Sequence, residues 1–176
     1  MFRLKESLHV EAPLERCFLL STSIEIVRQT IKLNPSVKTG LIHSGDMLWW
    51  RGVKFGLPAI HQTLITGYDR PNFFQDTMGH GMFKHFQHDH FFKFVDGQTL
   101  MWDVVRFSLP LGVAGRAIGR SVVVPHVLGL LLERFRLLKR IAEGDDWERY
   151  IPEDADRTLA AEKTIEAKSG IQSSWR

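Results

Sequence analysis

The sequence has only one cysteine, Cys17, among its 176 residues. A single cysteine excludes an intramolecular disulfide and a cysteine-based zinc site, and it is typical of a reducing compartment. The longest apolar run, residues 122–132, is too short to span a bilayer and is interrupted by a proline, a histidine and a glycine. The first ten residues alternate apolar and polar side chains where a signal peptide would need an unbroken apolar stretch. We therefore expect a cytoplasmic protein without a transmembrane segment.

Motifs that would assign a chemistry are also missing. The sequence contains no G-x-S-x-G elbow, no P-loop and no dinucleotide fingerprint. What is present is an ordinary globular composition, with 44% apolar and 24% charged residues. A chain of this length is the size of one domain and can bury a core of its own.

The net charge of +3 is unevenly distributed. Residues 145–176 carry eight acidic and five basic side chains, which leaves a balance of +6 for residues 1–144. Basic residues cluster in one segment, as Arg116, Arg120, Arg134, Arg136, Lys139 and Arg140. No nucleic-acid motif accompanies them, so we interpret them as a solvated helix face and expect no nucleic-acid partner. An interaction module that uses this basic helix and the acidic tail is an alternative.

Periodicity indicates an α+β fold. Residues 2–10 alternate as a half-buried strand does, and two short helices should follow, one opening at residues 12–15 and one running from Ser23 to about Lys32. Six further strands are expected in meander order, at residues 37–43, 46–55, 59–68, 72–78, 83–95 and 98–108. Asp96 and Gly97 are typical of the tight turn between the last two strands.

Beyond Pro110 the pattern becomes helical as far as Ala142, with a kink expected near Pro125. The predicted architecture is a curved, seven-stranded antiparallel sheet wrapped around this long C-terminal helix, with a cavity between them. We assign residues 1–143 to this domain. Residues 144–176 form an acidic tail, partly helical at about 153–168 or disordered.

Several stretches carry a family resemblance. These are APLE at 12–15 with Phe18, the turn at 45–46, FFQD at 73–76, GMFKHFQHDHFF at 81–92 and TLMWDVVRFSLPLG at 99–112. They resemble the START-like, or SRPBCC, superfamily, the helix-grip fold of lipid carriers, plant allergens and polyketide cyclases, and in particular its bacterial ligand-binding members. The likeness covers residues 1 to about 142. It implies an internal pocket for a small, largely apolar molecule.

Two histidines of the strand at 83–95 are expected to face this pocket. Alternation places His88 and His90 on the apolar face and His85 on the other. If Asp96 and Gly97 are the central turn residues, His90 lies directly opposite Asp103. The pair can act as an acid-base dyad, or the two side chains can satisfy each other inside the sheet, which is the interpretation that we favour.

The sequence constrains the orientation of Asp76 and the presence of a metal site less strongly. A three-residue loop after Gly79 would place Asp76 on the His88 face and a four-residue loop would place it outside; we expect it inside. An H-x-H pair with a carboxylate can bind a metal, but the glutamate of a cupin site is missing, since no Glu lies between residues 26 and 132. We expect no metal and no cofactor.

The predicted ligand-binding residues combine these polar groups with apolar neighbours. They are Asp76, His88, His90, Asp103, His61, Phe74, Phe86, Phe92, Met101, Leu128, Leu131 and Phe135. The first hypothesis is a non-enzymatic carrier of a small apolar molecule. The second is a cyclase or dehydratase in which His90, held by Asp103, removes a proton next to a carbonyl. Of Trp49 and Trp50 only one can reach the pocket, and the other could form a homodimer contact.

Overall fold

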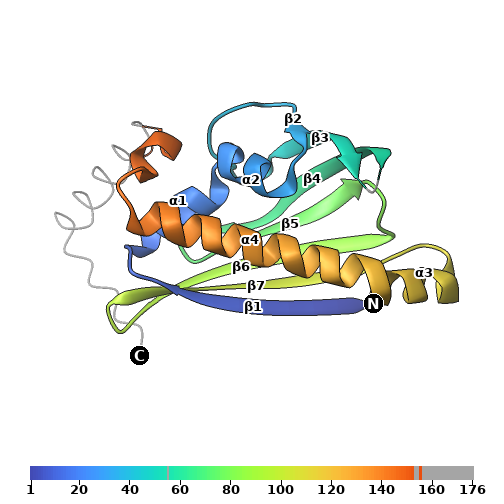
Figure 1. Cartoon of the computed structure of the whole chain (residues 1–176). Helices are drawn as coiled ribbons and strands as arrows, with labels where there is room; N and C mark the ends of the chain where they lie inside the picture. The colour runs from blue at the N-terminus through green and yellow to red at the C-terminus, as the bar shows by residue number, and fades with distance from the viewer. Residues whose placement is uncertain (55, 153–154, 156–176) are drawn as a thin grey trace.

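The computed structural model describes residues 1–54, 56–152 and 155. Among them, seven strands form one antiparallel sheet in the order β1-β7-β6-β5-β4-β3-β2. The strands are β1 (Phe2–Val10), β2 (Asn34–Pro35), β3 (Met47–Lys54), β4 (Leu57–Asp69), β5 (Phe73–His80), β6 (His85–Val95) and β7 (Gln98–Ser108). The α+β helix-grip prediction is confirmed: the sheet curves around a long C-terminal helix (Figure 1).

The hairpin of β6 and β7 has the predicted register. Asp96 and Gly97 both have positive φ, at 50° and 82°, as a tight turn of this kind requires. Val95 therefore pairs with Gln98, and His90 lies opposite Asp103. Because side chains alternate along a strand, this register puts both polar side chains on the concave face.

The helices cover the concave face of the sheet. α1 (Leu14–Thr22) and α2 (Ile24–Ile31) follow β1, and the C-terminal helix consists of α3 (Gly112–Ile118), the π-helical turn η1 (Gly119–Val123) and α4 (Val124–Glu143). Pro125 lies in the first turn of α4, where a helix tolerates a missing N–H. The sequence predicts a kink near Pro125; what the structure shows just before this residue is the π-helical turn η1. No helix in the described ranges is both long and apolar enough to cross a membrane.

The strand predicted at residues 37–43 was wrong. β2 instead pairs with β3 over two residues, and residues 37–43 leave the sheet. Their backbone bonds go to the junction of α1 and α2: Ile24 N donates to Gly40 O, and Ile42 N donates to Thr22 O. Gly40 makes this path possible with a φ of 109°.

One half of the space under the helix is solidly packed. Phe18 of α1 makes edge contacts with the rings of Phe74 and Phe92, and Leu138 of α4 belongs to the same buried cluster. The short 3-10 helix η2 (Trp147–Tyr150) packs on this end, where Arg16 stacks on the Trp147 ring. The tail helix expected at about 153–168 lies outside the described residues apart from residue 155, and residues 169–176 also lie outside them.

Candidate functional site

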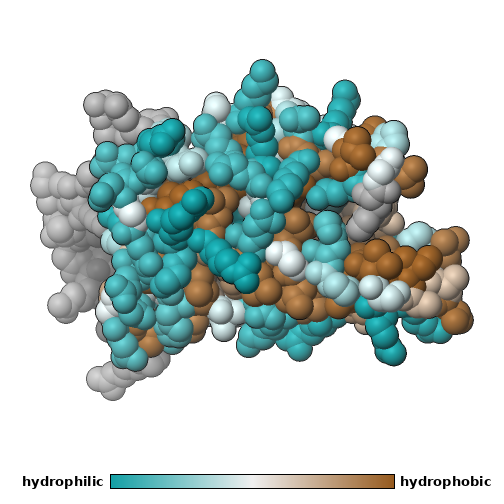
Figure 2. Space-filling view, viewed as in Figure 1, coloured by the Kyte–Doolittle hydropathy of each residue, from teal (hydrophilic) through white to brown (hydrophobic). Residues whose placement is uncertain are grey.

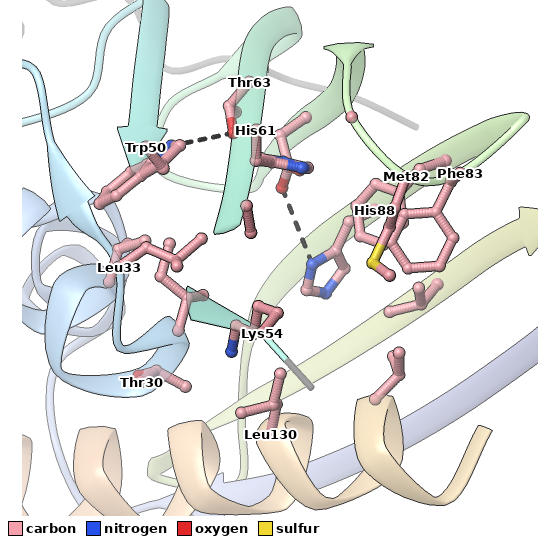
Figure 3. Close-up of a pocket in the computed structure, with 18 of the residues that line it drawn as sticks. Thr30, Leu33, Trp50, Lys54, His61, Thr63, Met82, Phe83, His88 and Leu130 are labelled. Carbon is pink, nitrogen blue, oxygen red and sulfur yellow. Dashed lines mark hydrogen bonds and ion pairs between the residues drawn. The ribbon is translucent and has the colours of Figure 1, made fainter. Parts of the chain in front are cut away.

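The other half of the space is hollow. A cavity of about 600 Å³ lies between the concave face of β3–β6, α2 and the first half of α4. It reaches the surface beside Leu57 and Met82, which line it and are exposed. Figure 3 shows His61, His88 and Met82 on the sheet side and Leu130 on the α4 side.

Most of the cavity wall is apolar, with Leu33, Ile42, Ile65, Val105, Val127 and Leu131 among its residues. Trp50 adds a large ring that is 1% exposed, and its Nε1 donates to Thr63 Oγ1 at 3.1 Å (Figure 3). Of the two adjacent tryptophans, Trp50 is the one that faces inward. The cavity therefore offers a ligand many apolar contacts and few fixed polar groups.

Five polar side chains at the cavity form one cluster from four elements. His90 lies between two carboxylates: its Nδ1 is 3.1 Å from Asp103 Oδ1, and its Nε2 is 3.0 Å from Asp76 Oδ2. His88 Nε2 is 3.1 Å from Asp103 Oδ2, and its Nδ1 is 3.7 Å from Asp76 Oδ2. Arg134 of α4 completes the cluster, with its Nε 3.9 Å from Asp103 Oδ2.

The inward orientation of Asp76 is as expected, but its pairing differs. Asp76 lies opposite His88, not Phe86, because the β5–β6 turn is longer than either loop considered from the sequence. The shift of two residues keeps the same face, since side chains alternate with a period of two. His85 is exposed, also as expected.

Both ring nitrogens of His90 face a carboxylate, so only the doubly protonated ring donates to both. Burial opposes this charged form, but the charge of Asp103 and the hydrogen bonds to both carboxylates outweigh burial and raise the pKa of His90. Burial alone would raise the pKa of Asp103, yet the two histidines hold this pKa well below its usual range. The protonated His90 and Arg134 thus balance the two carboxylates.

The pKa of His88 is shifted in the opposite direction from that of His90. Burial, followed by repulsion from the charged His90, lowers the pKa of His88 below its usual value. A neutral His88 that donates from Nε2 to Asp103 keeps a lone pair on Nδ1. His88 lines the cavity, so this ring can accept a hydrogen bond or a proton there.

Arg134 corrects one sequence interpretation. It was assigned to a solvated helix face, but it is 7% exposed and lines the cavity. Its Nη2 donates to Ser21 O at 3.0 Å, whereas its Nε has no hydrogen-bond partner among the described residues. Leu131 and Phe135 precede and follow Arg134 on the inward side of α4, and this spacing was the signal that sequence reasoning missed.

A metal ion is the other occupant that this cluster could hold. Donor atoms of Asp76, His88 and His90 all lie within 4.8 Å of one another. Two imidazoles and a carboxylate suit zinc or iron, and Asp103 contacts the remaining nitrogen of each ring, as outer carboxylates of metal sites do. An ion at this point would replace the proton that His90 shares with Asp76.

The predicted ligand-binding residues fall into two groups. Those that line the cavity are Asp76, His88, His90, His61, Phe74, Phe86 and Leu131. Those that are not part of its wall are Asp103, Phe92, Met101, Leu128 and Phe135. Asp103 lies behind the two histidines, and three of the others belong to the packed cluster around Phe18. Alternation identifies the inward face of a strand, but it does not say which part of that face is covered by α1.

Comparisons with known proteins agree with this geometry. No protein-family model matches the sequence, and no curated protein matches it. Solved structures do match: the Zhui aromatase/cyclase from Streptomyces sp. R1128 has 9% identity and a TM-score of 0.66, over 81% of this chain and 93% of that one. A START superfamily protein from Mycobacterium smegmatis has 12% identity and a TM-score of 0.58, over 75% and 92%.

A major latex-like protein from Panax ginseng has 14% identity and a TM-score of 0.59, over 81% of this chain and 98% of that one. At such identities the likeness establishes the fold. The chain has the START-like, or SRPBCC, fold, as the sequence resemblance predicted.

Proposed function

We propose that this protein binds and carries a small, largely apolar molecule in the cavity between sheet and helix. The observation that carries the proposal is a cavity of about 600 Å³ with an apolar wall and one polar cluster. A ligand that buries about 300 Å² of apolar surface would gain about 7 kcal/mol, before the entropic cost of binding. Apolar burial would thus supply most of the favourable free energy of binding, without any covalent step.

The polar cluster would set the orientation of the ligand. Asp76, His88 and Arg134 reach the cavity wall, so a ligand with one polar end, such as a carbonyl or hydroxyl, would place that end against them. The partly unsatisfied guanidinium of Arg134 is the strongest donor available there. We therefore expect an amphiphile such as a lipid or polyketide-like molecule, carried in the cytoplasm.

Mass spectrometry tests this proposal directly. The intact protein is measured under native conditions, and whatever co-purifies is extracted with organic solvent and identified. Carriage predicts a bound apolar molecule, or binding from a panel of lipids and aromatic polyketides. A protein that is empty and binds nothing from the panel would refute it. Elemental analysis of the same sample decides whether an ion or a proton lies between Asp76 and His90.

A pair of tryptophan variants links binding to the cavity. Leu130→Trp places a larger ring inside the cavity, because Leu130 lines it (Figure 3). The matched control is Gly129→Trp, because Gly129 is exposed on the outside of α4 and a Cβ there meets nothing within 4 Å. We expect the first variant to lose ligand and the second to keep it.

An enzymatic role is the second candidate, supported by the electrostatics of the two histidines. The sequence suggested His90 as the base, but a ring with two carboxylate partners and a raised pKa holds its proton. His88 has a lowered pKa, lines the cavity and is oriented by Asp103. In a cyclase or dehydratase, His88 Nδ1 would take the proton next to a carbonyl, and Arg134 would stabilise the oxyanion. His88→Gln should then abolish turnover without loss of ligand binding.

A further inference from the structure

Large apolar side chains are exposed at one end of the molecule. This end contains the β3–β4 turn, the β5–β6 turn and the start of α3. The register shows why: Gln62 of β4 pairs with His80 at the end of β5, and His85 at the start of β6 pairs with Ser108, the last residue of β7 before α3. The side chains concerned are Leu57, Met82, Leu111, Val113, Ile118 and Val122, which are 48% to 75% exposed. We call these six residues the apolar end. Figure 2 shows two hydrophobic areas at the right of the view, one over α3 and one over the β3–β4 hairpin.

The backbone at Leu111 is arranged to display its side chain. Leu111 has a φ of 70°, a region that residues with a Cβ rarely occupy, and Gly112 follows at 54°. Leu111 is 75% exposed, so the strain is not compensated by burial. Strained residues of this kind cluster at functional sites, so the exposed Leu111 points to a role for this surface.

The charge of this end has a single sign. The stretches that build it, residues 47–54, 56–68, 77–88 and 104–132, contain no Asp or Glu, although the whole chain has 20. The same stretches carry Arg51, Lys54, Lys84, Arg116 and Arg120, and also Arg106, which is paired with Asp89. Arg116 and Arg120 lie among the apolar residues of α3 and η1, and both are exposed.

We infer that the apolar end docks on an anionic phospholipid bilayer. The apolar side chains would enter the boundary between headgroups and acyl chains, and the basic side chains would contact the phosphates. A basic surface without acidic groups complements an anionic bilayer, whereas a symmetric contact with a second copy would bring the same positive charges together.

The position of the cavity mouth gives this surface a use. Leu57 and Met82 belong to the apolar end and also line the cavity. Docking would therefore bring the mouth against the lipid phase. Docking itself does not depend on what the cavity holds, so the two ideas can fail separately.

Vesicle flotation tests the inference with the full chain. Vesicles of phosphatidylcholine alone are compared with vesicles that also contain phosphatidylglycerol, at low and high salt. We expect binding to the mixed vesicles, weakened by salt. Arg116→Glu with Arg120→Glu should weaken binding at least about thirtyfold, since each basic residue near the surface contributes about fivefold. Leu111→Ser with Val113→Ser should weaken it at least about tenfold.

Matched controls lie at the opposite end of the sheet. Phe94 and Lys93, near the β6–β7 turn, are also exposed. Phe94→Ser and Lys93→Glu should bind the mixed vesicles as the unaltered protein does. Thermal unfolding shows whether each variant is folded. If the serine variants are not folded, the arginine variants alone test the inference.

Two results would overturn the inference. One is absence of vesicle binding, or binding that is equal with and without phosphatidylglycerol and unaffected by the arginine variants. The other is a stable dimer in light scattering that Leu111→Ser with Val113→Ser converts to a monomer, without any vesicle binding. In that case the apolar end is an interface between two copies.

Discussion

Replacement of Asp103 with asparagine should strongly destabilise the protein. Asp103 is 1% exposed, is within hydrogen-bond distance of both histidines at 3.1 Å each, and lies beside the buried Arg134. Asn keeps the shape but removes the charge, so Arg134 and the protonated His90 are left with one carboxylate, Asp76. Loss of one partner of a buried ion pair costs about 3–5 kcal/mol. For a chain of this size, that corresponds to a fall in Tm of about 6–20 °C.

The matched control is Asp89→Asn, on the opposite face of the neighbouring strand β6. Asp89 is also buried, and it accepts hydrogen bonds from Gln75 and Gln87 at 2.7 and 2.8 Å and pairs with Arg106. The Arg106 side chain is 32% exposed, so water can hydrate it when the carboxylate charge is lost, whereas the Arg134 side chain is 8% exposed. We expect Asp89→Asn to cost about 1–3 kcal/mol.

Urea unfolding followed by circular dichroism measures both variants. Addition of Arg134→Met to Asp103→Asn should recover part of the lost stability, because it removes the uncompensated charge. If Asp103→Asn costs no more than Asp89→Asn, or if the double variant is less stable than Asp103→Asn alone, the cluster is not a balanced set of charges and our account of it is wrong.

The unfolding free energy should depend on pH on both sides of neutrality. The lowered pKa values of Asp76 and Asp103 contribute stability above about pH 4, and this stability is lost as pH falls. The raised pKa of His90 contributes stability below about pH 6.5, and this stability is lost as pH rises through the pKa of the folded protein. Urea titrations from acid to alkaline pH measure both slopes, and a flat alkaline side would contradict the role given to His90. Gly129→Ala should raise the unfolding free energy by about 0.5–1 kcal/mol, because α4 has room for the added Cβ. Gly115→Ala should lower it, because the added Cβ would lie 1.8 Å from Pro110 O. Thermal unfolding compares the two variants, and a gain at both positions would contradict the packing described for α3. Burial raises the pKa of Cys17 to about 11, so iodoacetamide at pH 8 should label the thiol only after the protein unfolds. Mass spectrometry measures the labelling, and rapid labelling of the native protein would contradict the burial of Cys17.

The sequence was sufficient for the sheet and the long helix because their signals are local. Alternation, the Asp96-Gly97 turn and the apolar spacing beyond Pro110 each fix an element from a few neighbouring residues. One turn then determined the whole β6–β7 register, and with it the contact of His90 and Asp103. The strand prediction for residues 37–43 was wrong because their apolar pattern is that of a strand, whereas their backbone hydrogen-bond partners lie at the junction of α1 and α2.

The cavity was harder to place because it depends on distant packing. Phe92 and Met101 alternate inward as His88 does, yet Phe18 covers their end of the sheet and leaves the other end hollow. Arg134 was misplaced for a similar reason: its charge suggested a solvated position, and only the carboxylates of two strands explain its burial. Tertiary partners of this kind are far apart in the sequence.

The pairing of β1 with β7 has a consequence for biosynthesis. Phe2 lies opposite Phe107 and Val10 opposite Thr99, so β1 leaves the ribosome long before β7, the strand with which it pairs. Non-local pairings of this type are slow to form and leave a strand edge open to other chains in the meantime. Nascent chains of this protein are therefore expected to need chaperone protection until residue 108 has emerged.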